Sequence, residues 1–239
     1  MHAANLAEAT STLVFDLAKF SVRELNQALH DLPSGANETA WDVLNAGGHH
    51  AVAAGVEQPV NIDIRGSVGY YCGGMNQNAT ITVHGSAGPG LGENMMSGAI
   101  LVKGDASQYA GATGRGGLLV VEGNASSRCG ISMKGIDIVV HGNVGHMSAF
   151  MAQSGNLVVL GDAGDALGDS IYEARLFVRG QVKSLGADCV AKEMRAEDLK
   201  LLQELLDRAG VEGVRPDEFK RYGSARRLYN FNIDNADAY

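Results

Sequence analysis

The chain has 239 residues, of which 45% are hydrophobic, and its formal net charge of −8 gives a pI near 5.3. This length allows one main domain with a sizeable core, and the acidic balance argues against nucleic acid or an anionic membrane as a partner, because both attract clustered positive charge. Three cysteines without a C-x-x-C pair, no export-signal pattern and no long apolar stretch indicate a soluble protein of the reducing cytoplasm.

The first elements expected in chain order are a strand and a short helix. Thr12 to Asp16 has the pattern of a strand. Ser21, followed three residues later by Glu24, is the capping box of a helix that runs through Leu29. Residues 33–38 have the composition of a loop. We expect this front segment to close one end of the main domain.

A repeat of 19 residues follows, without insertion, in seven copies. Its marker glycines are Gly66, Gly85, Gly104, Gly123, Gly142, Gly161 and Gly180. Four residues before them stand Ile62, Ile81, Ile100, Leu119, Ile138, Leu157 and Leu176, and two before stand Ile64, Val83, Val102, Val121, Val140, Val159 and Val178. Because side chains two apart on a strand share a face, each copy contains a short strand with two apolar residues pointing inward.

Glycine at further fixed positions after each marker predicts sharp turns between strands. It recurs three residues on, as in Gly69 and Gly88, and seven residues on, as in Gly73 and Gly92. Such turns require positive φ or close backbone approach. The repeat therefore predicts an all-β fold, a right-handed single-stranded parallel β-helix of seven coils with short α-helical caps at both ends. The expected division is an N-terminal cap and connection over residues 1–58, the β-helix over 59–190, and a C-terminal helix and tail over 191–239.

One outward-facing column is apolar in most coils. It lies three residues before each marker glycine and includes Leu101, Val120, Val139, Val158 and Phe177 after Asp63 and Thr82. A continuous apolar stripe of this kind is expected to be covered. A helix with Leu199, Leu202, Leu205, Leu206 and Ala209 on one face, ending before Gly210, is expected after the repeat. Either this helix or a partner subunit covers the stripe.

Two glycine-rich segments resemble ligand loops but are interpreted as turns. GATGRGG, from Gly111 to Gly117, lacks the Lys-Ser/Thr ending of a phosphate loop, and no helix follows it. GDAGDALGD, from Gly161 to Asp169, resembles a calcium-binding turn, but the pattern occurs once and its third glycine has the common turn position.

The reactive residue types give no assembled site. Cys72 and Cys129 share a column with apolar residues and are expected in the core, where the sequence shows no adjacent base. His84 and His141 are three coils apart, too far to share a metal, and are expected to be solvated. The adjacent pair His49 and His50 favours a loop role over metal or substrate binding. His146, Met147 and Phe150 interrupt the usual turn, which indicates a contact site. We therefore expect no catalytic, cofactor-binding or metal-binding residue in this chain.

The spacing G-x-x-G-x-x-x-G at Gly66/Gly69/Gly73, Gly85/Gly88/Gly92 and Gly161/Gly164/Gly168 resembles the C-terminal (GXGXG) β-helix domain of glutamate synthase large subunits, over about residues 60–190. In that family the β-helix is a scaffold beside catalytic domains. An N-terminal cysteine nucleophile is missing here, since His2 follows Met1, and there is no iron–sulfur cysteine cluster. The chain thus looks like a free-standing version whose catalytic partners are separate polypeptides.

The segments Phe15 to Asn26 and Gly145 to Ala174 are similar to the free-standing β-helix subunit of N-methylglutamate synthase, also called methylamine–glutamate N-methyltransferase. The resemblance implies a non-catalytic subunit of an enzyme that converts methylamine and L-glutamate to N-methyl-L-glutamate and ammonia. The implied partners are a class II glutamine-amidotransferase-like subunit and a glutamate-synthase-like subunit that holds FMN. Two alternatives remain, a β-helix subunit of a formylmethanofuran dehydrogenase or formyltransferase/hydrolase complex, and a self-contained carbohydrate-binding β-helix.

Overall fold

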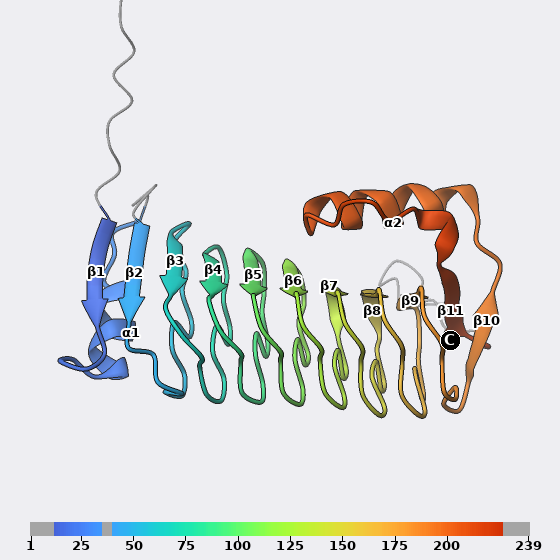
Figure 1. Ribbon diagram of the computed structural model, residues 1–239, viewed down its shortest axis with the longest axis horizontal. Helices are drawn as coiled ribbons and strands as arrows, with labels where there is room; N and C mark the ends of the chain where they lie inside the picture. The colour runs from blue at the N-terminus through green and yellow to red at the C-terminus, as the bar shows by residue number, and fades with distance from the viewer. Residues whose placement is uncertain (1–11, 35–39, 227–239) are drawn as a thin grey trace, which may run out of the picture.

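The computed structural model of the chain describes residues 12–34 and 40–226. It is a rod of stacked coils (Figure 1). The strands of the repeat are β3 (Asn61–Ile64), β4 (Thr80–Val83), β5 (Ala99–Val102), β6 (Leu118–Val121), β7 (Lys134–Val140), β8 (Ser154–Val159) and β9 (Arg175–Val178). They pair in parallel, and nearly every residue lies beside the one 19 positions further along the chain. The parallel β-helix predicted from the repeat is confirmed.

The core runs along the inside of the rod. Every member of the two inward apolar columns is at most 1% exposed. A third column of small apolar residues, beginning with Val68 and Ala87, is joined from coil to coil by isolated parallel bridges. Burying one Val, Leu or Ile side chain fully contributes roughly 1.5–3 kcal/mol. The two inward columns of these residues are therefore the main source of the stability of the rod.

Glycine serves two different purposes in the turns. A Cβ atom on Gly85 would lie 2.6 Å from the carbonyl carbon of Gly66, and one on Gly88 equally close to that of Gly69. These positions therefore need glycine because adjacent coils approach closely. The later position needs the left-handed conformation instead: Gly73 has a φ of 61°, and Ala149 adopts 57° at the equivalent place.

The sheet begins earlier than the repeat. β2 (Ala40–Leu44) pairs in parallel with β3 at an offset of 21 residues, and β1 (Thr12–Asp16) pairs in parallel with β2. Sheet structure thus starts well before residue 59, whereas the division of the chain into three units stays a prediction. α1 (Val22–His30) has the predicted capping box: the Ser21 amide donates to Glu24 Oε2 over 2.7 Å and the Glu24 amide donates to Ser21 Oγ over 3.3 Å.

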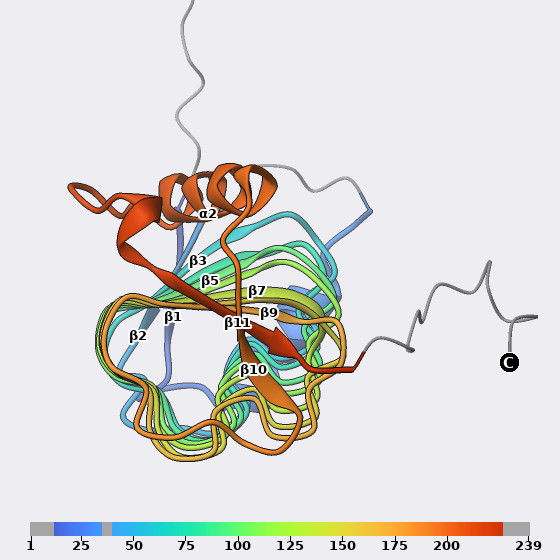
Figure 2. The ribbon, with the colours of Figure 1, turned by 90° about the vertical axis from the view of Figure 1, so that its right-hand side faces the viewer.

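The C-terminal end differs in detail from the expected helical cap. α2 (Ala196–Arg208) lies outside the coils, along the sheet (Figures 1 and 2). The end itself is occupied by β11 (Lys220–Ser224), which pairs antiparallel with β9 and with β10 (Cys189–Lys192), after the short 3-10 helix η1 (Pro216–Glu218). The physical reason is that the open edge of β9 needs a strand to complete its backbone hydrogen bonds, which a helix cannot supply.

A polar column directly after the marker glycines ties the turns together. From Ser67 to Asp162, each side chain of this column accepts a hydrogen bond from a backbone amide one coil further on. Asn124 Oδ1 accepts from the Asn143 amide over 2.9 Å, and Asn143 Oδ1 accepts from the Asp162 amide over 2.7 Å. Ser67 and Ser86 accept equivalent bonds in the first coils. The ladder satisfies turn amides that strand pairing leaves unbonded.

Replacing Asn124 by Ala should lower the free energy of unfolding by about 1 kcal/mol, because the Asn143 amide loses its acceptor. Asn124→Ser is the matched control, since serine already fills this position in two coils. Thermal denaturation followed by circular dichroism would measure both variants. An Asn124→Ser variant as unstable as Asn124→Ala would contradict this role for the ladder.

Candidate functional site

The outward face of the sheet is divided into a covered half and an open half. Leu202, Leu205 and Leu206 of α2 are buried against a separate apolar cluster outside the coils. The sheet contributes Leu118, Val120, Val139, Val158 and Phe177 to this cluster, and Leu101 packs at its margin. The sequence left open whether the chain's own helix or a partner subunit covers the apolar stripe. The structure shows that α2 covers the stripe from Val120 to Phe177.

Charged contacts fix both ends of α2. At its start, the fully buried Asp198 lies 3.3 Å from Arg221 Nε on β11 and 3.7 Å from Arg175 Nη1 on β9. At its end, Arg208 Nη1 donates to Asp137 Oδ2 on β7 over 2.9 Å. A buried carboxylate needs such cations, because an unpaired one would be strongly destabilising.

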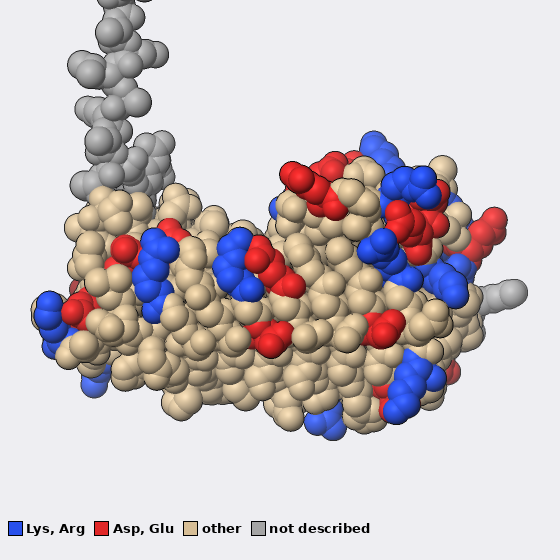
Figure 3. Space-filling view, in the orientation of Figure 1, with Lys and Arg blue, Asp and Glu red and all other residues tan. Residues whose placement is uncertain are grey.

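The open half lies over β2 to β5, and both basic and acidic side chains lie on this part of the surface (Figure 3). Arg65 Nε is 2.6 Å from Asp42 Oδ1, and Arg65 Nη1 is 3.1 Å from His84 Nε2. The same His84 nitrogen is 2.5 Å from Asp63 Oδ1. His84 was expected to be solvated, and it is exposed but engaged in this network, which forms a polar surface that α2 leaves uncovered.

His141 lies on the same face and is partly buried, contrary to the solvated position expected for it. Among the residues that the structure describes, its Nε2 atom has no hydrogen-bond partner. Burial lowers the pKa of His141, and Lys103 lowers it further, while Glu122 acts in the opposite direction. No pattern in the sequence indicates this burial.

A histidine with a lowered pKa makes stability dependent on pH. In the unfolded chain His141 takes up a proton near pH 6.5, whereas in the folded chain it does so at lower pH. The stability of the wild type should therefore fall as the pH decreases through about 6.5 towards the lowered folded pKa. His141→Gln should weaken this dependence, measured as melting temperature between about pH 7.5 and 5. An unchanged pH dependence in the variant would contradict the assignment.

His49, His50 and His146 lie in the loops and turns between strands. His50 Nδ1 accepts a hydrogen bond from the Tyr70 amide over 2.8 Å, and the His49 carbonyl accepts one from the Gly69 amide. Through these two hydrogen bonds, His49 and His50 have the loop role that was expected for the pair. The His146 carbonyl accepts from the Arg128 amide over 2.9 Å. This segment therefore keeps the ordinary bonding between coils.

The cysteines are core residues, as expected for Cys72 and Cys129. Both are fully buried, and burial raises the pKa of each thiol to about 12. Burial also raises the pKa of Cys189 to about 11. Because the thiolate is the nucleophilic form, the raised pKa disfavours reaction of these three thiols at neutral pH.

The two glycine-rich segments form turns. In the first, a Cβ on Gly114 would lie 2.8 Å from Ile136 Cδ1, so the backbone packs on the core. In the second, Asp162 Oδ1 accepts from the Gln181 amide over 2.7 Å, and Asp165 Oδ2 lies 2.8 Å from Lys183 Nζ. The carboxylates that a cation would need are thus used in contacts between coils.

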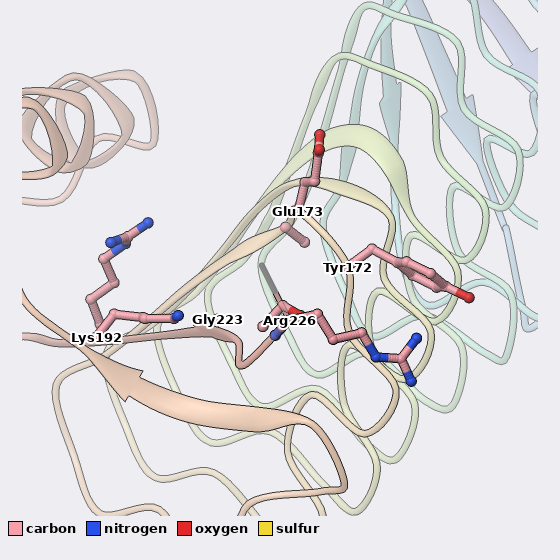
Figure 4. A pocket seen from close by; sticks show the side chains of 8 residues that line it. Tyr172, Glu173, Lys192, Gly223 and Arg226 are labelled. Carbon is pink, nitrogen blue, oxygen red and sulfur yellow. The ribbon is translucent and has the colours of Figure 1, made fainter. Parts of the chain in front are cut away.

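A pocket of about 220 Å³ lies between the turn before β9 and the strands β10 and β11 (Figure 4). Tyr172 and Arg226 line one end and Lys192 lies at the other. Arg226 is paired with Asp188, and its guanidinium carbon is 5.9 Å from the centre of the Tyr172 ring. Arg221, which also lines the pocket, faces Asp198. Two of the three basic side chains that line this pocket therefore form ion pairs between neighbouring segments at the C-terminal end of the rod.

Within residues 12–34 and 40–226, no three His, Cys, Asp or Glu side chains lie close enough together to hold a metal ion. Over the same ranges, neither helix is long and apolar enough to cross a bilayer.

Sequence reasoning missed the strands β10 and β11 and the buried Asp198 cluster. β10 and β11 lie outside the 19-residue repeat, and their pairing joins segments about thirty residues apart. The polar column of turn acceptors was also missed, although its period could have shown it, since short polar side chains follow most of the marker glycines.

Comparison with known proteins agrees with this architecture. The family model described as GXGXG motif matches residues 48–212, so the chain belongs to this family, as its resemblance to the glutamate synthase β-helix domain implied. Protein GlxC of Rhizobium meliloti (strain 1021) is 71% identical over 226 residues, which are 95% of this chain and 99% of the relative. A chain of the formyltransferase/hydrolase complex from Methylorubrum extorquens, solved with methylofuran, has the same fold at 21% identity, with a TM-score of 0.53 over 84% of this chain and 89% of that one.

Proposed function

We propose that this chain is the scaffold subunit of a glutamate-synthase-like enzyme made of several polypeptides. The observation that carries the proposal is membership of the GXGXG family over residues 48–212. The structural neighbour supports the multi-subunit part, because it is a chain of a formyltransferase/hydrolase complex. In this proposal the chain positions catalytic partners and contributes no catalytic group.

The open half of the outward face is the proposed contact with a partner. Parallel sheets are generally covered on both faces, and α2 covers only the part from β6 to β9. The surface around Arg65 and His84 offers hydrogen-bonding and charged groups to a polar partner surface. Such complementarity favours specific association.

The proposed reaction is that of N-methylglutamate synthase, in which methylamine and L-glutamate give N-methyl-L-glutamate and ammonia. The partners would be a glutamine-amidotransferase-like subunit and a glutamate-synthase-like subunit that holds FMN. The resemblance of residues 15–26 and 145–174 to the β-helix subunit of that enzyme supports this choice.

Affinity purification of the tagged chain from its native host tests the proposal. We expect two further chains, a flavin absorbance spectrum and turnover of methylamine with glutamate. Recovery of formyltransferase or hydrolase chains would identify the alternative complex, and a lone colourless protein would contradict a scaffold role.

Surface variants connect this test to the structure. Arg65→Glu reverses a charge in the open half and should reduce the recovery of the partner chains. Lys200→Glu, on the exposed side of α2, is the matched control and should leave their recovery unchanged. Equal recovery with both variants would exclude the open half as the contact.

A further inference from the structure

Within the part of the chain that the structure describes, the rod ends on its N-terminal side in an open strand edge. Among the described residues, β1 is the last strand of the sheet and pairs with β2 alone (Figure 1). Val14 is 64% exposed, Leu13 43% and Phe20 50%. The strand β1 contains no proline, and its one charged residue is Asp16 at its C-terminal end, so the usual protections of an exposed edge are missing from Thr12 to Phe15.

The backbone of β1 shows which groups are open. The Leu17 amide donates to the Leu44 carbonyl over 3.0 Å, so the backbone groups of residue 17 point towards β2. Because these groups alternate in direction along a strand, those of Phe15 and Leu13 also point towards β2. The amide and carbonyl of Val14 therefore point away from the sheet, at the centre of the open edge.

The side chains of β1 are arranged so that the strand matches itself. Leu13 and Phe15 lie in register with Trp41 and Val43 on the inward face, while Val14 is in register with Asp42 on the outward face. In an antiparallel pair centred on Val14, each Leu13 would face the Phe15 of the other strand. The two Val14 residues would exchange both backbone hydrogen bonds.

We propose that two copies of this chain associate end to end, through antiparallel pairing of their β1 strands about a twofold axis at Val14. The pairing would continue the sheet and the apolar core from one rod into the next. It also keeps like charges apart, since each Asp16 would lie opposite a Thr12 and the two Asp16 residues would be about 14 Å apart.

A second copy fits this edge better than an unrelated strand, because the apolar and polar positions of residues 12–16 are symmetric about Val14. The association would also end at two copies. At the other end of the rod, the edge strand β10 carries the exposed Lys192, a residue type that opposes further strand addition. This inference does not depend on the proposed enzymatic function.

Cysteine cross-linking of the isolated full-length chain tests the register. The two Cα atoms of a hydrogen-bonded antiparallel pair are about 5.5 Å apart, which suits a disulfide. Val14→Cys should therefore form a disulfide-linked dimer of about twice 25.0 kDa on mild oxidation. The native cysteines are all buried, and Met75→Cys, at a side chain that is 51% exposed, is the control that should stay largely unlinked.

Charge variants supply the second arm of the test, with mass measured by light scattering. Wild type should be dimeric, Val14→Lys and Val14→Glu should each be monomeric and folded, and an equimolar mixture of the two variants should regain the dimer. A monomeric wild type would overturn the proposal. So would a Val14→Cys chain that cross-links only to a different subunit, because the edge would then bind that subunit.

Discussion

The Val139→Asp variant should lose about 4 kcal/mol of unfolding free energy, because the new carboxylate would be buried without a partner between the sheet and α2. Val139 is fully buried in the cluster that includes Leu202, Leu205 and Phe219. We expect α2 to detach before the coils unfold. Thermal denaturation by circular dichroism and limited proteolysis within residues 196–208 would measure the two effects.

Thr82→Asp is the matched control for this substitution. Thr82 occupies the same outward column three coils earlier, in the half that α2 leaves open. An added carboxylate there stays hydrated, so the melting temperature should change little. Equal destabilisation by the two substitutions would show that α2 does not protect Val139 from water.

The Gly85→Ala variant should lose about 3 kcal/mol, because overpacking here involves rigid neighbours. The added methyl group would lie 2.6 Å from both Gly66 C and Ser67 N. Since these are backbone atoms, relief requires the first two coils of the repeat to move apart. Denaturation by guanidinium chloride would measure the loss.

Gly223→Ala separates this clash from a general effect of glycine replacement. A Cβ on Gly223 would meet its nearest neighbours at 3.7 Å, an ordinary contact. This variant should therefore be nearly as stable as the wild type. If Gly85→Ala were equally stable, the close approach of adjacent coils would not limit the side chain at this position.

The parts of the fold that can be predicted from the sequence are those set by short-range rules. The inward columns follow from alternation along strands, and the start of α1 follows from hydrogen bonds between Ser21 and Glu24. The position of α2 depended on long-range packing, so its apolar face predicted a covered surface without identifying it. The sequence therefore allowed either the chain's own helix or a partner subunit to cover the stripe from Val120 to Phe177. Only the contacts of Leu202 and Leu205 decide between the two.

The surroundings of the polar residues on the outward face of the sheet were harder to predict. His84 and His141 have the same position in the repeat, yet one joins an exposed charged network and the other is partly buried. What differs is the burial of the two side chains, which no local pattern in the sequence records. Asp198 looks like an ordinary helix-start acid in the sequence, and its burial depends on arginines from β9 and β11.

The charged contacts at the two ends of α2 match the length of the helix to the spacing of the strands beneath it. Asp198 and Arg208 are ten residues apart, about 15 Å along a helix axis, and their partners lie on β11 and β7. These strands are three spacings apart in the sheet order, about 14 Å. Removing one whole coil between β3 and β5 would keep this match, whereas removing one between β7 and β9 would break it. The rod can therefore change length by whole coils only in its N-terminal half.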